Sequence, residues 1–534
     1  MTTQTNEEKK PALLTEIPQK AGGREWLGLA VLALPTLLLS IDLSVLHLAL
    51  PQLSADLGAN STELLWITDI YGFMIAGLLI TMGTLGDRIG RRKLLMIGGA
   101  AFGVASVLAA YSTSPTMLII TRALMGIAGA TLMPSTLALI SNMFTVPRQR
   151  GIAIAVWMSC FMGGMAFGPV VGGVFIELFW WGAAFLLGVP IMLLLLGTAP
   201  FLLPEFRNTK AGNLDLISVA LLLATILPII YGLKELARHG WQVGGIAVAI
   251  TGICFGLLFC YRQVRLTHPL LDLNLFSNRT FSAALVISLI VGAVQGGILF
   301  LMNMYLQLVE GLSPLIAGLW LVPSSLAMIA ATMLAPFLVK RVRPAYIIAA
   351  GLMTSAIGYQ ILSQLDINGG LSVAIIGIVM VMMGVGPMGA LSTDLIVGSA
   401  PPEKSGAAAA VSESAAEFGI ALGIAALGSL GTSIYRSQML IPEGVPVQFA
   451  EAASESIISV VSIADQLDAP LGTILIGVAR EAFTNGLNAS ALLSTFIFIA
   501  LALASIIFLR HVSPSGEVLH DQMDENRNTQ SAIK

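Results

Sequence analysis

Five charged residues interrupt long apolar stretches of the chain, and each needs a functional or structural reason. They are Asp42, Asp69, Arg122, Glu413 and Glu417. Placing a charge in hydrocarbon is costly, so such residues mark ion or substrate pathways or pair with one another. A carboxylate in that setting can take up a proton or bind a cation. These five residues are therefore our candidates for proton coupling and substrate binding.

Asp42, Asp69 and Arg122 are expected at similar depth in neighbouring helices. With a helical rise of about 1.5 Å per residue, Asp42 lies roughly 24 Å from the inner end of its helix and Asp69 roughly 10 Å from the outer end of the next. Two interpretations remain open. The three side chains form a polar cluster facing a water-filled cavity, or an Asp–Arg pair locks the bundle. The first interpretation is favoured because a single arginine cannot neutralise both carboxylates.

Glu413 and Glu417 are four residues apart, which places them on one face of a helix. Two like charges in a medium of low dielectric constant do not both ionise cheaply, so we expect at least one to take up a proton readily. The alternative that Glu417 bonds to backbone, and that Glu413 alone reaches the cavity, stays open.

Four aromatic side chains are candidates to stack on a bound cation through their ring faces. They are Trp66, Tyr71, Trp157 and Tyr305. Packing or interfacial roles are equally compatible with the sequence.

The composition indicates which solvent surrounds these residues. Hydrophobic residues make up 56% of the chain and charged residues 11%, with a mean hydropathy of +0.87, against about 25% charged residues in globular proteins. The net charge of −3 offers no positive field for nucleic acid. No phosphate-binding loop, metal-ligand cluster or catalytic motif is present, so we expect neither an enzyme nor a cofactor or metal. We predict an all-α integral membrane protein.

Apolar windows broken at glycine, proline and charge clusters predict fourteen transmembrane helices. Their expected ranges are 26–50, 62–83, 93–112, 115–141, 151–176, 182–203, 213–234, 243–261, 280–308, 314–338, 344–364, 370–398, 405–434 and 487–510. Between the last two lies an outer segment, residues 435–486, whose amphipathic stretches indicate a small ordered element. A lid and an inert insertion are both open for it.

The distribution of basic residues supports this count independently. With the N-terminus inside, 22 of the 27 lysines and arginines fall on the cytoplasmic side, four fall outside and Arg122 is intramembrane. A missed helix would reverse the side of every later loop. Residues 1–25 lack the apolar core of a signal peptide. We therefore expect a multi-pass protein of the inner (plasma) membrane with both termini cytoplasmic.

An internal repeat in the sequence predicts that the membrane domain consists of two halves. A basic cluster ends the second helix of each half, at residues 83–93 and 336–344, and a glycine-rich helix follows at the same offset in each. We expect two parallel six-helix halves, as many transporters have, with two extra helices between them. The expected division is a tail at 1–25, a bundle at 26–203, the extra helices at 204–265, a second bundle at 266–510 including the outer segment, and a tail at 511–534.

Several motifs together resemble the major facilitator superfamily, and specifically its fourteen-helix drug:proton antiporters of the QacA type. The superfamily's signature loop is matched by Gly83, Gly86, Asp87, Arg88, Gly90 and Arg91, and the antiporter motif of helix 5 by Gly168, Pro169 and Gly172. Asp42 with the following Ala49-Leu50-Pro51 resembles the helix 1 signature of the fourteen-helix branch. The segments 65–71 and 405–413 resemble the quaternary ammonium exporters in particular.

The resemblance implies a major facilitator fold and proton-coupled export of lipophilic cations such as quaternary ammonium biocides and dyes, driven by the proton gradient. Asp42, Asp69 and Glu413 would be the protonation and cation-recognition sites, Arg122 would tune Asp42, and Asp87 would latch the cytoplasmic side. The predicted helix 314–338 lacks the acidic residue of relatives that handle divalent cations, so monovalent substrates are expected. Lipids surround such a protein, which would act as a monomer without nucleic-acid partners. A transporter of a physiological solute or lipid is the alternative.

Overall fold

A computed structural model describes residues 20–514, except 60, 208–214, 240–241, 267–268, 368, 402–403 and 465. All regular secondary structure in these residues is helical. Thirteen helices in the described part of the chain are long and apolar enough to cross a membrane. The 32-residue α5 (Pro147–Leu178), which is not among them, lies alongside α1 in the bundle. With α5 the arrangement agrees with the fourteen predicted crossings.

The first bundle comprises seven helical segments. They are α1 (Gly23–Leu57), α2 (Ser61–Ile89), α3 (Arg91–Ala110), α4 (Pro115–Met143), α5, α6 (Ala183–Leu186) and α7 (Gly188–Leu202). The short α6 and α7 together form one apolar crossing, residues 183–202. The helices α8 (Leu216–His239) and α9 (Val243–Arg265) follow as a hairpin.

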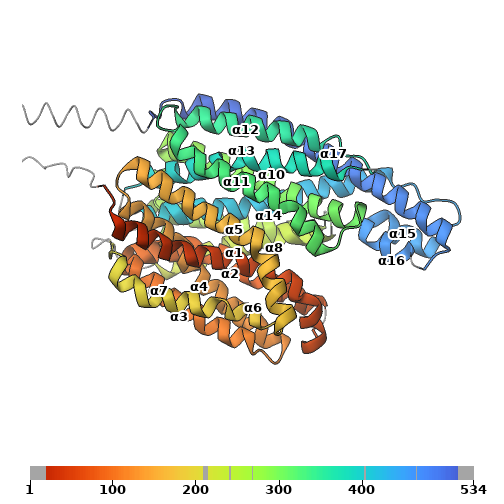
Figure 1. The fold of residues 1–534 in the computed structure, drawn as a ribbon, viewed down its shortest axis with the longest axis horizontal. Coiled ribbons are helices and arrows are strands. Elements are labelled where there is room, and N and C mark those ends of the chain that lie inside the picture. Colours follow the sequence, from red (N-terminus) through yellow and green to blue (C-terminus); the bar gives the residue numbers. More distant parts are fainter. Residues whose placement is uncertain are drawn as a thin grey trace, which may run out of the picture.

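The second bundle begins after a short 3-10 turn, η1 (Leu273–Ser277). Its helices are α10 (Arg279–Met304), which continues as a π-helical turn, η2 (Tyr305–Val309), α11 (Pro314–Leu338), α12 (Pro344–Leu362), α13 (Leu371–Gly398), α14 (Ser405–Gln438), α15 (Val447–Glu455), α16 (Ile457–Ala464) and α17 (Ala469–Leu509). Figure 1 shows the two bundles side by side, with α14 near their junction.

The apolar core divides in the same way. One buried cluster is drawn mainly from residues 29–203 and a second from residues 287–509. Glycines allow the helices within each bundle to approach closely. A Cβ at Gly172 of α5 would lie 2.5 Å from Val45 of α1, and one at Gly297 of α10 would lie 2.5 Å from the carbonyl of Gly423 in α14. Small residues at such positions are typical of packed membrane helices.

The ends of the bundle differ. The start of α1 and the end of α17 lie at one end, which we call the terminal end, whereas α15 and α16 extend beyond the opposite, distal end (Figure 1). Because the first helix begins and the last helix ends at the same end, the number of crossings between them must be even. This agrees with the fourteen predicted crossings.

The outer segment differs from the prediction. The last helix begins at Ala469 rather than at 487, so 18 residues assigned to the loop belong to α17. Arg480, one of these 18 residues, donates a hydrogen bond to the carbonyl of Leu308. This polar side chain interrupts the apolar pattern but bonds within the protein instead of ending the helix.

Candidate functional site

Asp42 and Arg122 form an ion pair in the interior of the first bundle. The guanidinium Nη1 of Arg122 lies 2.6 Å from Oδ2 of Asp42. The side chain of Arg122 is 1% exposed and that of Asp42 is 8% exposed. Removing either partner would leave a buried charge without compensation, which is strongly destabilising. The side chain of Asp69 lies outside the described residues.

The remaining surface of the Arg122 guanidinium is covered by α2 and α6. Its Nε donates to the carbonyl oxygen of Ile67 at 3.4 Å, and its Cζ lies 4.3 Å from the ring centre of Tyr71 and 5.8 Å from that of Phe185. Aromatic faces attract a guanidinium at these distances. Arg122 is thus fixed by one carboxylate, one carbonyl and two rings.

A small cavity opens beside this ion pair and is lined by Asp42 together with apolar groups. Its lining residues are Leu38, Ile41, Asp42, Val45, Leu46, Phe102, Met125, Trp181, Ala184 and Phe185. Asp42 is the ionisable residue among them. The Asp42 carboxylate is thus paired with arginine and also faces a largely apolar cavity, whereas the predicted cluster with Asp69 stays a prediction.

Glu413 and Glu417 lie on the face of α14 that is turned toward the first bundle. A Cβ at Gly83 of α2 would lie 2.6 Å from the carbonyl of Gly406 and 2.7 Å from the Cβ of Ala410. Positions 406, 410, 413 and 417 follow each other at spacings of three and four, so they share one helical face. The hydroxyl of Tyr71 in α2 lies in the electrostatic field of Glu417. The glutamates are thus directed at the junction of the two bundles.

The structure does not place the predicted aromatics around the cavity. Trp157 is 1% exposed and its Nε1 donates to Thr136, so its ring belongs to the core between α4 and α5. Tyr305 is fully buried at the distal end, where its hydroxyl donates to Glu310. Tyr71 covers Arg122. Trp66 is 39% exposed and lies beside Phe73. For Trp157 and Tyr305, the hydrogen-bonding groups are satisfied within the protein and the rings are buried, which agrees with the packing role that the sequence left open.

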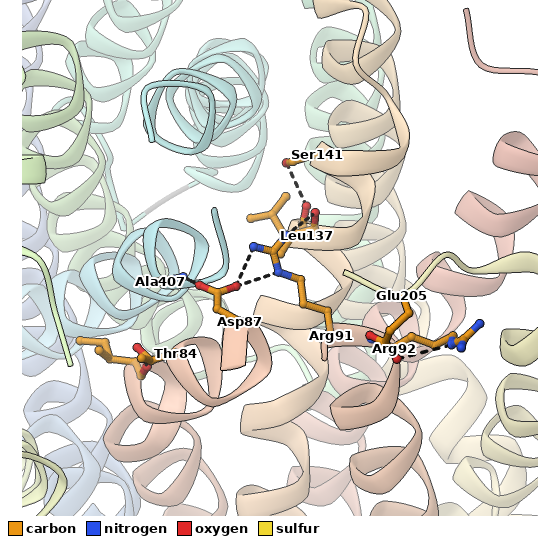
Figure 2. A network of polar contacts seen from close by, with 10 residues as sticks. Thr84, Asp87, Arg91, Arg92, Leu137, Ser141, Glu205 and Ala407 are labelled. Atoms are coloured by element: carbon orange, nitrogen blue, oxygen red, sulfur yellow. Dashed lines mark hydrogen bonds and ion pairs between the residues drawn. The ribbon is translucent and has the colours of Figure 1, made fainter. Parts of the chain in front are cut away.

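The signature loop lies at the terminal end and joins the two bundles. Asp87 accepts hydrogen bonds from Nε of Arg91 at 2.7 Å and from the backbone N–H of Ala407 at 3.2 Å. Figure 2 shows Asp87 between Arg91 and α14. Arg91 also reaches the carbonyl of Ala138 in α4. Asp87 therefore links α2, α3 and the start of α14.

The glycines of this loop have distinct roles. Gly90 connects α2 to α3 with a φ of 112°, a conformation that other residues rarely adopt. Gly83 allows α2 to approach α14. The glycines of the helix 5 motif lie in α5, where Gly168 and Gly172 are buried; the side chain of Pro169 lies outside the described residues.

A second bridge between the bundles lies at the same end. Nε of Arg150, in the first turn of α5, lies 2.6 Å from Oδ1 of Asp394, near the end of α13. We name the contacts Asp87–Ala407, Gly83–Gly406 and Arg150–Asp394 together the closure. Asp394 was not among our candidates, although a carboxylate within the predicted span 370–398 is a signal that would have identified it. In the described residues no group of three metal-ligating side chains occurs.

Known proteins similar to this chain are resistance and export proteins. The multidrug efflux pump LfrA of Mycolicibacterium smegmatis is 42% identical over 90% of this chain and 95% of its own length. The methyl viologen resistance protein SmvA of Salmonella typhimurium is 35% identical over 86% of this chain and 93% of its own. The tetracenomycin C resistance and export protein of Streptomyces glaucescens is 30% identical over 81% of this chain and 80% of its own.

Solved structures confirm the fold. The human organic anion transporter MFSD10 superposes with a TM-score of 0.56 over 89% of this chain and 98% of its own, at 14% identity. A bacterial homologue of the human lysosomal transporter Spinster, in an inward-facing conformation, gives 0.55 over 92% and 99%, at 15% identity. Identities this low are evidence for the architecture alone.

A sequence-family description agrees with this architecture. The model of the Major Facilitator Superfamily matches residues 32–424. Together with the many membrane-spanning helices and the resistance exporters among its relatives, this match shows a transporter rather than an enzyme. The chain is a multi-pass membrane protein that belongs to the Major Facilitator Superfamily.

Proposed function

We propose that the chain is a proton-coupled antiporter of the fourteen-helix drug-exporter type, which expels lipophilic organic cations such as quaternary ammonium compounds and dyes. It would lie in the plasma membrane with both termini cytoplasmic, so that the closure seals its cytoplasmic side. The proton gradient would supply the energy. The observation that carries this proposal is the Asp42 carboxylate, which is buried, paired with Arg122 and exposed to a cavity.

The Asp42–Arg122 pair supplies a site where protons and cations exclude each other. A protonated Asp42 no longer neutralises Arg122, and the freed guanidinium repels an approaching cation. A deprotonated Asp42 attracts Arg122 or, when the pair opens, a cationic substrate. Proton uptake from outside therefore releases a bound cation, and proton loss inside restores its site. Such a group gives the ligand different affinities in two states, which transport requires.

The acidic face of α14 adds a second element to the site. Glu413 and Glu417 are turned toward the first bundle, so a cation between the bundles would meet carboxylates on both sides. This arrangement disfavours anionic ligands. It also allows the charge state of the site to depend on how closely the bundles approach.

The names of the relatives support this class of substrate. They include a multidrug efflux pump and a protein of methyl viologen resistance. Methyl viologen and ethidium are organic cations with apolar rings, a chemistry that apolar side chains and a carboxylate complement. We propose a preference for monovalent cations, because α11 carries no acidic residue.

Efflux from cells that express the protein tests the energy source. Cells preloaded with ethidium are energised, and loss of fluorescence is followed with and without a protonophore. We expect efflux to stop when the proton gradient collapses and to continue when only the ATP pool is reduced. Efflux that survives the protonophore contradicts proton coupling. If cations are not moved at all but a neutral or anionic solute is, the chain transports a physiological solute instead.

A further inference from the structure

The helices α8 and α9 form a hairpin between the two bundles. Glycines allow the two helices to pack closely. A Cβ at Gly232 of α8 would lie 2.7 Å from the carbonyl of Gly245 in α9, and one at Gly252 of α9 would lie 2.6 Å from a methylene of Ile229 in α8. The hairpin contacts the bundles through α8, which packs on α2 and α14. These are the two helices whose close approach forms part of the closure.

Gln263 connects the end of this hairpin to the chain that follows it. Its side chain lies in the last turn of α9 and the residue is 3% exposed. Its Oε1 accepts hydrogen bonds from the backbone N–H groups of Leu270 at 2.7 Å and Leu271 at 3.3 Å. Its Nε2 donates to the hydroxyl of Ser218 in α8 at 2.8 Å. One amide therefore ties both hairpin helices to the segment leading to α10.

That segment, residues 269–274, which we call the strap, contacts both sides of the closure. The hydroxyl of Thr84 in α2 donates to the carbonyl of Leu270 at 2.9 Å. Asp272 forms an ion pair with Lys404, the residue that precedes α14. Thr84 and Lys404 lie close in sequence to Asp87 and Ala407, which meet across the closure. The strap thus spans the junction at which α2 and α14 come together.

Charged groups at the base of the hairpin fix the orientation of this network. Ser218, which accepts from Gln263, donates to Asp215, and Asp215 accepts from Nε of Arg262 at 2.9 Å. Partial burial alone would raise the pKa of Asp215, but the hydrogen bonds from Ser218 and Arg262 outweigh it and lower the pKa. The pKa of Asp272 is lowered in the same way by its bond to Lys404, against partial burial. Both carboxylates therefore stay ionised at neutral pH.

We propose that Gln263 is a positioning residue for the closure. It holds the strap in the place where the strap bridges α2 and α14, and the inserted hairpin thereby stabilises the closed arrangement of the terminal end. Leu270 and Leu271 are 2% and 7% exposed, so their N–H groups have little access to water if the glutamine is removed. A buried N–H without a partner is costly, and the cost falls on the closed arrangement in which the strap is seated.

The distance between the two bundles at the terminal end tests this role. Spin labels are placed on the full-length protein in lipid nanodiscs through Arg207→Cys, just after α7, and Val342→Cys, between α11 and α12. Both positions are exposed, and Cys160, Cys254 and Cys260 are first replaced by alanine. Double electron–electron resonance then gives the ratio of closed to open molecules. We expect Gln263→Leu to lower this ratio roughly tenfold, the effect of losing hydrogen bonds to buried N–H groups.

A matched pair of threonine substitutions provides the control. Thr84→Val removes the hydroxyl that reaches the strap, whereas Thr251→Val, on the exposed face of α9, removes one that bonds only within its own helix. Thr84→Val should lower the closed fraction and Thr251→Val should leave it unchanged. Because Gln263 and Thr84 act on the same strap, the double variant should lower the ratio by less than the product of the two single effects.

Two results would overturn the proposal: an unchanged distance distribution in both Gln263→Leu and Thr84→Val, or an equal effect of Thr251→Val. Thermal unfolding of each variant separates a shift in the closure from a general loss of stability. The proposal uses the function proposed above only to give the closure its role in transport. The distance measurement needs neither substrate nor proton gradient, so it remains decisive if the proposed cation export fails.

Discussion

Arg122 of α4 and Asp42 of α1 lie 2.6 Å apart in the interior of the first bundle, and the ring of Tyr71 covers the guanidinium. This pair is at once a lock between two helices and the ionisable part of a cavity. Breaking such a pair by removing one partner leaves an uncompensated charge. A proton or a cation that reaches Asp42 must therefore displace an arginine, which links occupancy of the site to the packing of α1 against α4.

Removing the charge of Asp42 should abolish coupled efflux. Asp42→Asn keeps the size of the side chain and an oxygen for Arg122, but it can neither release a proton nor neutralise a cation. We expect at least a tenfold loss of ethidium efflux at wild-type expression levels. Asp56→Asn, on the exposed outer part of the same helix, is the control and should transport normally. Efflux by Asp42→Asn at the wild-type rate would refute the assignment.

A methyl group at Gly83 should oppose the closure. A Cβ there would lie 2.6 Å from the carbonyl of Gly406, so α2 and α14 must separate to admit it. Gly83→Ala should shift the spin-label distances toward the open arrangement and reduce efflux several-fold. Gly72→Ala is matched, because it lies on the same helix and its Cβ meets nothing within 4 Å. Similar distance distributions for the two variants would show that this contact does not limit closing.

The ion pair between Arg150 and Asp394 should be restored by exchanging its charges. Each single reversal, Arg150→Asp or Asp394→Arg, places like charges across the closure and should lower the closed fraction. The double reversal should recover most of it. Reversing Arg92 and Glu205, which pair within the first bundle, should leave the closed fraction intact. A double variant no better than the worse single variant would argue against a pairwise bridge.

Because α11 lacks an acidic residue, we predict that the protein exports monovalent cations faster than divalent ones. Initial efflux rates of ethidium, with one positive charge, should exceed those of methyl viologen, with two, by several-fold in cells that accumulate both. Met328 is buried in α11, and the helix carries no Asp or Glu along its length. Equal rates for the two cations would show that α11 acidity does not set the preference.

The sequence predicted most of the architecture because hydropathy and basic residues report on the membrane directly. The span 314–338 coincides with α11, where Ser313 caps the helix and Pro314 begins it. The prediction for the last helix was wrong at its start. Arg480 interrupts the apolar pattern before residue 487, and its hydrogen bond to the carbonyl of Leu308 cannot be recognised from local sequence.

The composition of the candidate site was predictable, and an Asp–Arg pair was one of the two interpretations that the sequence left open. Asp42 and Arg122 were identified because placing a charge in hydrocarbon costs free energy, and the structure brings them together. The roles of the aromatics were not predictable, because an aromatic residue near a carboxylate in sequence can face it, cover its partner or fill the core. Trp157 fills the core. Gln263 is uncharged, so neither hydropathy nor charge cost distinguishes it from other polar residues at a helix end.

Proton movement on addition of substrate is the most direct test of whether Asp42 exchanges protons for cations. Purified protein is reconstituted into liposomes with a pH-sensitive dye inside and no initial proton gradient, and a gradient of ethidium is then imposed. Exchange of protons for cations at Asp42 should give a proton flux opposite in direction to that of the cation, saturable with ethidium and lost in Asp42→Asn. Cation movement without any change in internal pH would contradict exchange of protons for cations at this site.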